Sequence, residues 1–205
     1  MAHIIGRALP SVVYTHTAAI SASTATFTFN SVAISTASAH RYVVVGMSFI
    51  GNVFTGITFN GSAMTSIGSP ATGMYIAPAP TGTTGTVVIT QTPSGAGIAT
   101  IMVWAVYHIN SPTQHAYVTS TATPAALSLN VPSRGIVIAV AYPNLNGATC
   151  TWAGVTGDVS QTSSINNIVR GGASATATIA ETPRLVTCTY SGSGAFRGAS
   201  AASWR

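Results

Sequence analysis

The chain of 205 residues has no lysine and carries little charge of either sign. Only 4% of its residues are charged, where roughly 25% is usual for a globular protein. All seven basic residues are arginine, and the only acids are Asp158 and Glu181. Without lysine, a P-loop or a Schiff-base enzyme is excluded. Two carboxylates are barely a pair for glycoside hydrolysis and too few for a calcium site.

Cysteine and histidine are also sparse, and neither shows metal-ligand spacing. The five histidines never stand four apart or in an HxH pair, and the chain has no CxxC. The sequence therefore predicts no metal, no cofactor and no catalytic residues, with a ligand set assembled from distant loops as the alternative. Cys150 and Cys188 stand in strand-like runs and are predicted to be buried thiols. A disulfide between them stays open if their strands pair, although a reducing cytosol disfavours one.

No feature points to a membrane or to nucleic acid. The longest apolar run, residues 98–107, is about half the ~20 residues that a spanning helix needs. The arginines are scattered singly, without the basic and aromatic groove of a strand-binding protein. The N-terminus has no apolar core of a secretory signal. We expect a protein that is made in the cytoplasm and binds neither nucleic acid nor membrane.

The shortage of charge instead favours self-association. A surface of Ser, Thr, Asn, Gln and Gly gives little repulsion between molecules, as suits a protein whose neighbours cover much of it. The sequence therefore predicts a member of a larger assembly. The alternative is a soluble threonine-rich sandwich that tolerates low charge.

Short strands separated by turns fill the chain. Residues 24–29 alternate threonine with alanine or phenylalanine, as a half-buried strand does, and no window shows a helical period. Asn60-Gly61 is the preferred pair for a two-residue hairpin turn with positive φ at both positions. Turn residues recur often enough to predict an all-β fold, a single-domain β-sandwich of jelly-roll type.

One stretch occurs twice. Residues 41–61 (RYVVVGMSFIGNVFTGITFNG) and residues 134–154 (RGIVIAVAYPNLNGATCTWAG) match without a gap at an offset of 93, since 134 − 41 = 93. The same offset joins Phe59 to Trp152 and Gly61 to Gly154. We therefore predict two pseudo-repeated halves, about residues 24–107 and 118–204. Because each half has few clearly apolar strands, we expect them to interleave within one domain, residues 11–205.

Two places are candidates for contact with other molecules. Residues 1–10 form a predicted arm, in which Ile4, Ile5, Leu9 and Arg7 are expected to bind a neighbouring subunit together with the nearby His16. The alternative is that the arm is an edge strand of the protein's own sandwich. Trp152, beside the turn at Gly154, is a candidate ligand contact.

A resemblance extends this interpretation. The segments GITFNGSAMT (residues 56–65), MYIAPAPTGTTGTVVIT (residues 74–90) and GASAASW (residues 198–204) resemble those of threonine- and glycine-rich β-sandwich proteins that form virion components of tailed bacteriophages and prophages. The resemblance covers residues 24–204 and implies a structural role. It implies a capsid decoration (cement) or head-fibre protein, located in the virion, that binds the major capsid protein or another virion protein. A homo-oligomer, with a trimer as one option, is expected. The alternative is a receptor- or glycan-binding tail component or carbohydrate-binding module.

Overall fold

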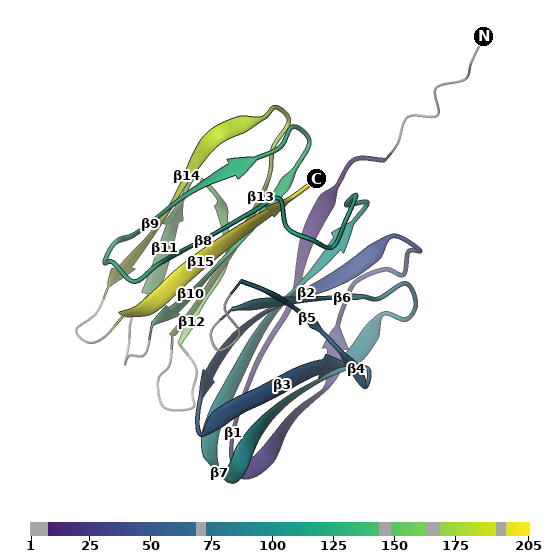
Figure 1. The fold of residues 1–205 in the computed structure, drawn as a ribbon, viewed down its shortest axis with the longest axis vertical. Coiled ribbons are helices and arrows are strands. Elements are labelled where there is room, and N and C mark those ends of the chain that lie inside the picture. Colours follow the sequence, from purple (N-terminus) through teal and green to yellow (C-terminus); the bar gives the residue numbers. More distant parts are fainter. Residues whose placement is uncertain (1–7, 69–72, 144–148, 163–168, 192–195) are drawn as a thin grey trace.

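The computed structural model describes residues 8–68, 73–143, 149–162, 169–191 and 196–205. In these ranges the chain forms antiparallel strands packed as sandwiches, so the predicted all-β fold is confirmed (Figure 1). In chain order the strands are β1 (Ser11–Ala33), β2 (Arg41–Ile50), β3 (Val53–Phe59), β4 (Ser62–Ala63), β5 (Thr65–Ile67), β6 (Met74–Pro78), β7 (Thr84–Tyr107), β8 (Ala116–Ser120), β9 (Ala125–Val131), β10 (Ile136–Pro143), β11 (Thr149–Ala153), β12 (Thr156–Thr162), β13 (Val169–Thr176), β14 (Glu181–Ser191) and β15 (Phe196–Trp204).

A long antiparallel ribbon of β1 and β7 organises the first half. The C-terminal part of β7 also pairs with β2, and its N-terminal part pairs with β3. The ribbon therefore joins β2, β6 and β5 to β3 and β4 within one seven-stranded sheet, with the two groups of strands at different ends of β7. A register shift opposite residues 91–94 separates the two parts.

The second half repeats this pairing. Strand β10 lies between β13 and β15, as β2 lies between β6 and β7. Strand β14 lies between β11 and β9, as the N-terminal part of β7 lies between β3 and β1. Strands β8 and β9 correspond to the N-terminal and C-terminal parts of β1. Strands β14 and β15 correspond to the N-terminal and C-terminal parts of β7. The predicted two-fold repetition of the fold is thus present in the strand order.

Each half closes its own apolar core, which differs from the expected interleaving. Buried residues of the first core all lie between Phe27 and Val103, and those of the second all lie between Ala125 and Ala201. The second core is built largely from alanine and other small side chains. A search of the sequence for large apolar residues misses the strands of such a core, because close-packed small side chains also exclude water.

A third buried cluster joins the two halves along a seam. Trp104 on β7 and Val44 on β2 face Ile138 and Val140 on β10. The sheets approach closely there, since a Cβ on Gly172 would lie 2.8 Å from the Trp104 ring. Figure 1 shows the two sandwiches packed side by side across this seam.

The 93-residue offset holds only in part. It correctly relates Gly61 and Gly154, which have φ of 81° and 80°. In the preceding strand, however, it relates Phe49 of the first core to Tyr142 of the seam, which are on opposite faces. An offset of 94 preserves the faces there, because strand side chains alternate with a period of two.

This correction changes the partner of Arg41. The Arg41 carbonyl accepts a hydrogen bond from Ala79, and the equivalent carbonyl in the second half is that of Gly135, which accepts one from Ala177. Arg134 is therefore not the structural counterpart of Arg41, contrary to the sequence match. Consistently, Arg41 is 1% exposed whereas Arg134 is exposed.

The buried Arg41 guanidinium fastens two loops. Its Nε donates to the Ala79 carbonyl at 2.7 Å. Its Nη1 and Nη2 donate to four further carbonyls at 2.6–3.1 Å, those of Ile34, Ser35, Thr81 and Gly82. All five N–H groups of the side chain are thus used, and the charge is stabilised by carbonyl dipoles instead of a carboxylate.

Candidate functional site

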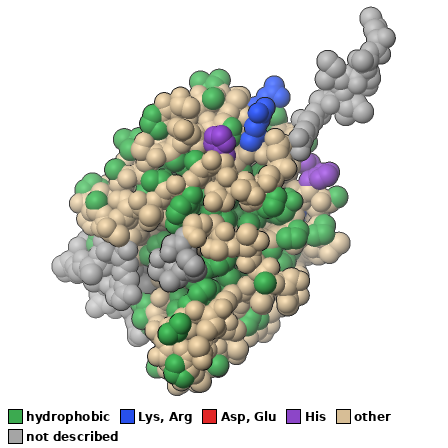
Figure 2. Space-filling view, viewed as in Figure 1, with side chains coloured by type: hydrophobic (Ala, Val, Ile, Leu, Met, Phe, Trp, Pro, Cys, Tyr) green, Lys and Arg blue, Asp and Glu red, His purple; other side chains and the backbone are tan. Residues whose placement is uncertain are grey.

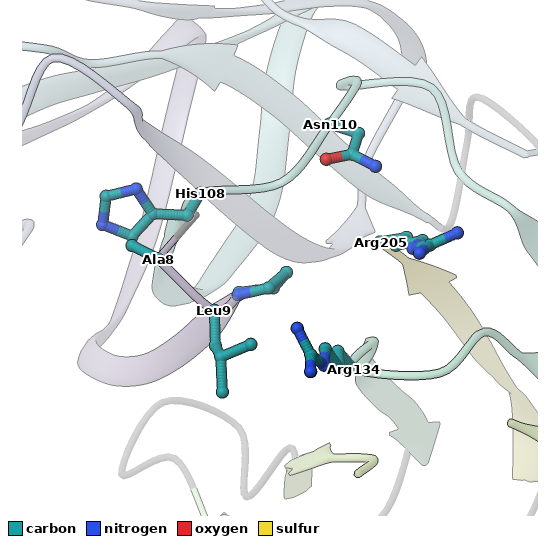
Figure 3. Close-up of a pocket in the computed structure, with 7 residues that line it drawn as sticks. Ala8, Leu9, His108, Asn110, Arg134 and Arg205 are labelled. Atoms are coloured by element: carbon teal, nitrogen blue, oxygen red, sulfur yellow. The ribbon is translucent and has the colours of Figure 1, made fainter. Parts of the chain in front are cut away.

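The clearest recess lies where the N-terminal arm meets the seam. Two adjoining pockets share Leu9, Pro10 and Arg134, and we call them together the arm-base groove. Figure 3 shows the first pocket, where Leu9 and Arg134 lie beside each other and Asn110 and Arg205 form another wall. The groove is completed by Ala8 and His108 in the first pocket and by Gly135, Thr176, Ala177 and Thr178 in the second.

Strand register brings these distant segments together. Ser11 at the start of β1 pairs with Tyr107 at the end of β7, so residues 8–10 lie near residues 108–110. Ile136 at the start of β10 pairs with both Thr176 and Trp204. The segments that precede or follow these strands therefore meet at one end of the molecule, between the two halves.

A turn presents Arg134 at this end. The Gly135 N–H donates to the Pro132 carbonyl at 2.9 Å, which closes a tight turn over residues 132–135. Arg134 has φ of 58°, a left-handed conformation that is unusual for a residue with a side chain. Arg205 is also exposed, and its main-chain oxygen accepts a hydrogen bond from the Asn110 N–H.

The two groove arginines differ from the other arginine side chains that the structure describes. Arg41 and Arg170 are buried. Arg184 forms a bidentate ion pair with Glu181. Among the arginine side chains that the structure describes, only those of Arg134 and Arg205 are exposed. Neither has a carboxylate or another hydrogen-bond partner for its guanidinium in the described part of the chain. The groove thus gathers two available positive charges on a surface that has few.

Apolar side chains lie around these charges. Leu9 is 57% exposed, and Ile179, next to Thr178 of the groove, is 70% exposed. On the face drawn in Figure 2, most of the surface is uncharged, green is scattered, and blue atoms gather in one place. The arm-base groove therefore combines exposed apolar surface with positive charge.

Only some of the residues predicted for the arm contact are among those that the structure describes. Ile4, Ile5 and Arg7 lie outside the described residues, whereas Leu9 lines the groove. His16 lies in β1, where burial lowers its pKa, and it is not among the groove residues. His108 lines the first pocket together with Leu9.

Sequence reasoning missed His108, Arg134 and Arg205 as site residues. The repeat had singled out Arg134, but as a partner of Arg41 in the fold. Nothing in the local sequence marks the three as neighbours, since strand pairing across the whole chain brings them together.

Trp152 lies in a second, shallower recess. It lines a groove between β11 and β12 with Asp158 and Ser160. The Trp152 side chain is half-buried, and its indole N–H is buried without a hydrogen-bond partner among the described residues. The Ser160 hydroxyl accepts a hydrogen bond from the Cys150 N–H at 2.9 Å, which ties the two strands at this groove.

The Asn60-Gly61 turn has the geometry that the sequence predicts. Phe59 pairs with Ser62, so the loop contains two residues, and φ is 49° at Asn60 and 81° at Gly61. The Asn60 side-chain oxygen also accepts the Thr86 N–H at 2.8 Å. This turn holds β3 against β7 and has a structural role.

The two cysteines are free and buried, as the sequence predicts. They lie on neighbouring strands, where Cys150 is opposite Tyr190 and Cys188 is opposite Trp152. The contact with the Cys150 thiol, together with burial, raises the pKa of Cys188 well above its usual range. Cys188 is therefore a protonated, unreactive thiol at neutral pH.

Within the described ranges, no three His, Cys, Asp or Glu side chains are grouped so that they could hold a metal ion. The same part of the chain contains no helix long and apolar enough to cross a membrane. Comparisons of the chain with protein-family models, curated proteins and solved structures gave no match. Its function is therefore inferred from the residues and the geometry described above.

Proposed function

We propose that this chain is a non-enzymatic structural protein of a phage-like virion, a capsid decoration or head-fibre protein that binds the major capsid protein or another virion protein. The observation that carries the proposal is the nature of its outer surface. Strands β3 and β4 of the first half and β9, β11 and β14 of the second face outward, since the seam cluster contains none of their residues. Apart from the exposed Leu185, these outward faces carry mainly hydroxyl and small side chains, among them Thr26, Thr28 and Thr90 in the first half and Ser128, Thr151 and Thr189 in the second.

Such faces suit a protein that is packed among neighbours. Because they carry almost no charge, copies can approach one another or a shell without electrostatic repulsion. The buried seam cluster fixes the two sandwiches relative to each other, so the unit is a rigid spacer. A groove with exposed apolar residues at one end supplies a place of attachment, and apolar patches of this kind commonly mark interaction sites.

Copy number in purified particles tests the proposal. Particles from a host that expresses this chain are purified by density gradient, and the chain is quantified by mass spectrometry against isotope-labelled peptides. Hundreds of copies per particle are expected for shell decoration, whereas a handful would point to a tail component. A chain that is missing from the particles, while abundant in the lysate, would refute a virion role.

A glycan-binding role is the second candidate, and the groove at Trp152 favours it. An indole beside the Asp158 carboxylate and the Ser160 hydroxyl offers an apolar surface with polar groups at its edge, as sugar rings require. Titration of neutral oligosaccharides against the intact chain, followed by tryptophan fluorescence, distinguishes the two roles. Binding that Trp152→Ala abolishes would support the glycan role, and its absence would remove it.

A further inference from the structure

We infer that the arm-base groove binds an extended acidic segment of a virion partner, whose carboxylates pair with Arg134 and Arg205 and whose apolar side chains cover Leu9. The inference rests on the proposed function, because it names the chemistry of the partner at the attachment site. The partner is identified by complementarity of charge and of apolar surface.

Charge is the first reason. Arg134 and Arg205 line one pocket, are exposed, and have no carboxylate partner among the described residues. The chain's two acids are used elsewhere: Asp158 accepts a hydrogen bond from Trp104, and Glu181 pairs with Arg184. Two guanidinium groups in one recess favour carboxylates, since each can form a bidentate, charge-assisted pair.

Apolar surface is the second reason, and it argues against a simple anion. Leu9 is 57% exposed, Pro10 lines both pockets, and the second pocket adds Ala177 to the lining. Phosphate groups or a nucleic-acid backbone would leave this apolar surface in water, whereas a peptide with alternating acidic and apolar side chains covers it. The groove also lies between the ends of several strands, where an extended segment can lie without disturbing the sheets.

Backbone conformation is the third reason. Arg134 occupies a left-handed position, with φ of 58°, at the tip of a closed turn. Such positions cost free energy and are found where the surrounding structure holds them in place. The turn directs the Arg134 side chain toward Leu9, as Figure 3 shows. The charged and apolar parts of the groove are thereby arranged before any partner arrives, which favours binding by a preformed site.

The test uses the full-length chain and two fluorescein-labelled hexapeptides. One alternates leucine and aspartate, and the other replaces each aspartate by asparagine. Binding is measured by fluorescence anisotropy in 50 mM and in 500 mM NaCl. We expect the aspartate peptide to bind more tightly than the asparagine peptide and to lose affinity in high salt, because the pairs are exposed and screened. Replacing both arginines (Arg134→Gln with Arg205→Gln) should weaken aspartate-peptide binding by roughly twofold to thirtyfold.

Matched variants show whether charge and apolar surface both contribute. Arg134→Lys with Arg205→Lys keeps the charge and should retain most of the affinity. Leu9→Ser should weaken both peptides, and Thr28→Val, on the outward face of β1, should change neither. Equal binding of the two peptides, or full binding by the double glutamine variant, would overturn the inference. It is likewise overturned if inorganic phosphate or a single-stranded oligonucleotide competes equally well and Leu9→Ser has no effect.

Incorporation into particles separates this inference from the virion role. If the double glutamine variant joins particles at the normal copy number, the groove is not the attachment site although the virion role stands. If the peptide binds as expected but the chain is absent from particles, the virion role fails and the groove remains an acidic-segment site.

Discussion

The Trp104 indole N–H donates to the Asp158 carboxylate at 2.8 Å, and this hydrogen bond crosses the seam between the two halves. Trp104 belongs to β7 of the first half and is fully buried, while Asp158 belongs to β12 of the second. One of only two acids in the chain is thus used to satisfy the indole N–H of a tryptophan in the seam. The two halves are therefore held together by this hydrogen bond as well as by the apolar packing of the seam.

Removing this acceptor should destabilise the protein. Asp158→Ala leaves the buried Trp104 N–H unsatisfied, so we expect the free energy of unfolding to fall by about 1–2 kcal/mol. Asp158→Asn keeps an amide oxygen that can accept the same bond and should lose less. Urea unfolding followed by tryptophan fluorescence measures both. An alanine variant as stable as the native chain would show that water replaces the carboxylate without loss.

Arg41→Met should be among the most damaging single changes. It removes five hydrogen bonds to carbonyls and leaves buried acceptors without donors, so we expect a loss of about 3 kcal/mol or more in the free energy of unfolding. Chemical denaturation of the purified variant measures this loss, and failure to fold at 37 °C would agree with it.

Two other arginines serve as controls for Arg41. Arg134→Gln changes an exposed side chain and should alter stability by no more than about 0.5 kcal/mol. Arg170 is 4% exposed, but toward the residues that the structure describes its guanidinium makes one hydrogen bond, from Nη1 to the Thr17 hydroxyl at 3.1 Å, and its Nε has no partner among them. Because the desolvation cost of Arg170 is poorly offset, Arg170→Met should be nearly neutral or stabilising. Equal losses for the variants at 41 and 170 would contradict the assigned role of the Arg41 hydrogen bonds.

The two turn glycines should respond differently to substitution. Both have φ near 80°, so any side chain is strained, and Gly61→Val should cost about 1 kcal/mol or more. A Cβ at Gly61 meets no atom within 4 Å, whereas a Cβ at Gly154 would lie 2.1 Å from the Leu185 carbonyl oxygen. Gly154→Ala should therefore cost more than Gly61→Ala. Thermal unfolding of the two alanine variants gives the order, and a loss below about 0.5 kcal/mol for Gly61→Val would mean that the loop tolerates a side chain.

The two cysteine thiols should react with a thiol reagent only slowly until the protein unfolds. In native buffer, Ellman's reagent should react slowly with Cys150 and Cys188, because both are buried and the pKa of Cys188 is raised. In 8 M urea, two thiols per chain should react at once. Fast labelling of the native protein would contradict the burial, and fewer than two thiols in urea would indicate a disulfide.

Removal of residues 1–10 tests the arm contact predicted from the sequence. We expect the truncated chain to stay folded, because the described residues of this segment, 8–10, belong to none of the three buried clusters, and to lose its place in the particle or oligomer. Circular dichroism reports the fold, and sedimentation with particles reports attachment. Unfolding of the truncated chain, or its normal assembly, would each count against the arm as an assembly contact.

The sequence by itself determined the class of fold and its local turns. Period-two alternation in residues 24–29 and the absence of a helical period were sufficient for an all-β sandwich, and Asn60-Gly61 carried its turn geometry in its own side chains. These features are local, so the residues that cause them stand beside the structure that they form. The repeat also showed that one strand arrangement is used twice.

Tertiary structure decided which face each repeated residue occupies. A shift of one position moves a strand side chain from one face of its sheet to the other, so the ungapped match paired Arg41 with Arg134 although one is buried and the other is exposed. The arm-base groove was decided in the same way. Leu9, His108, Arg134 and Arg205 are separated by up to 196 positions (205 − 9), and only the register of β1, β7, β10 and β15 brings them to one end of the molecule.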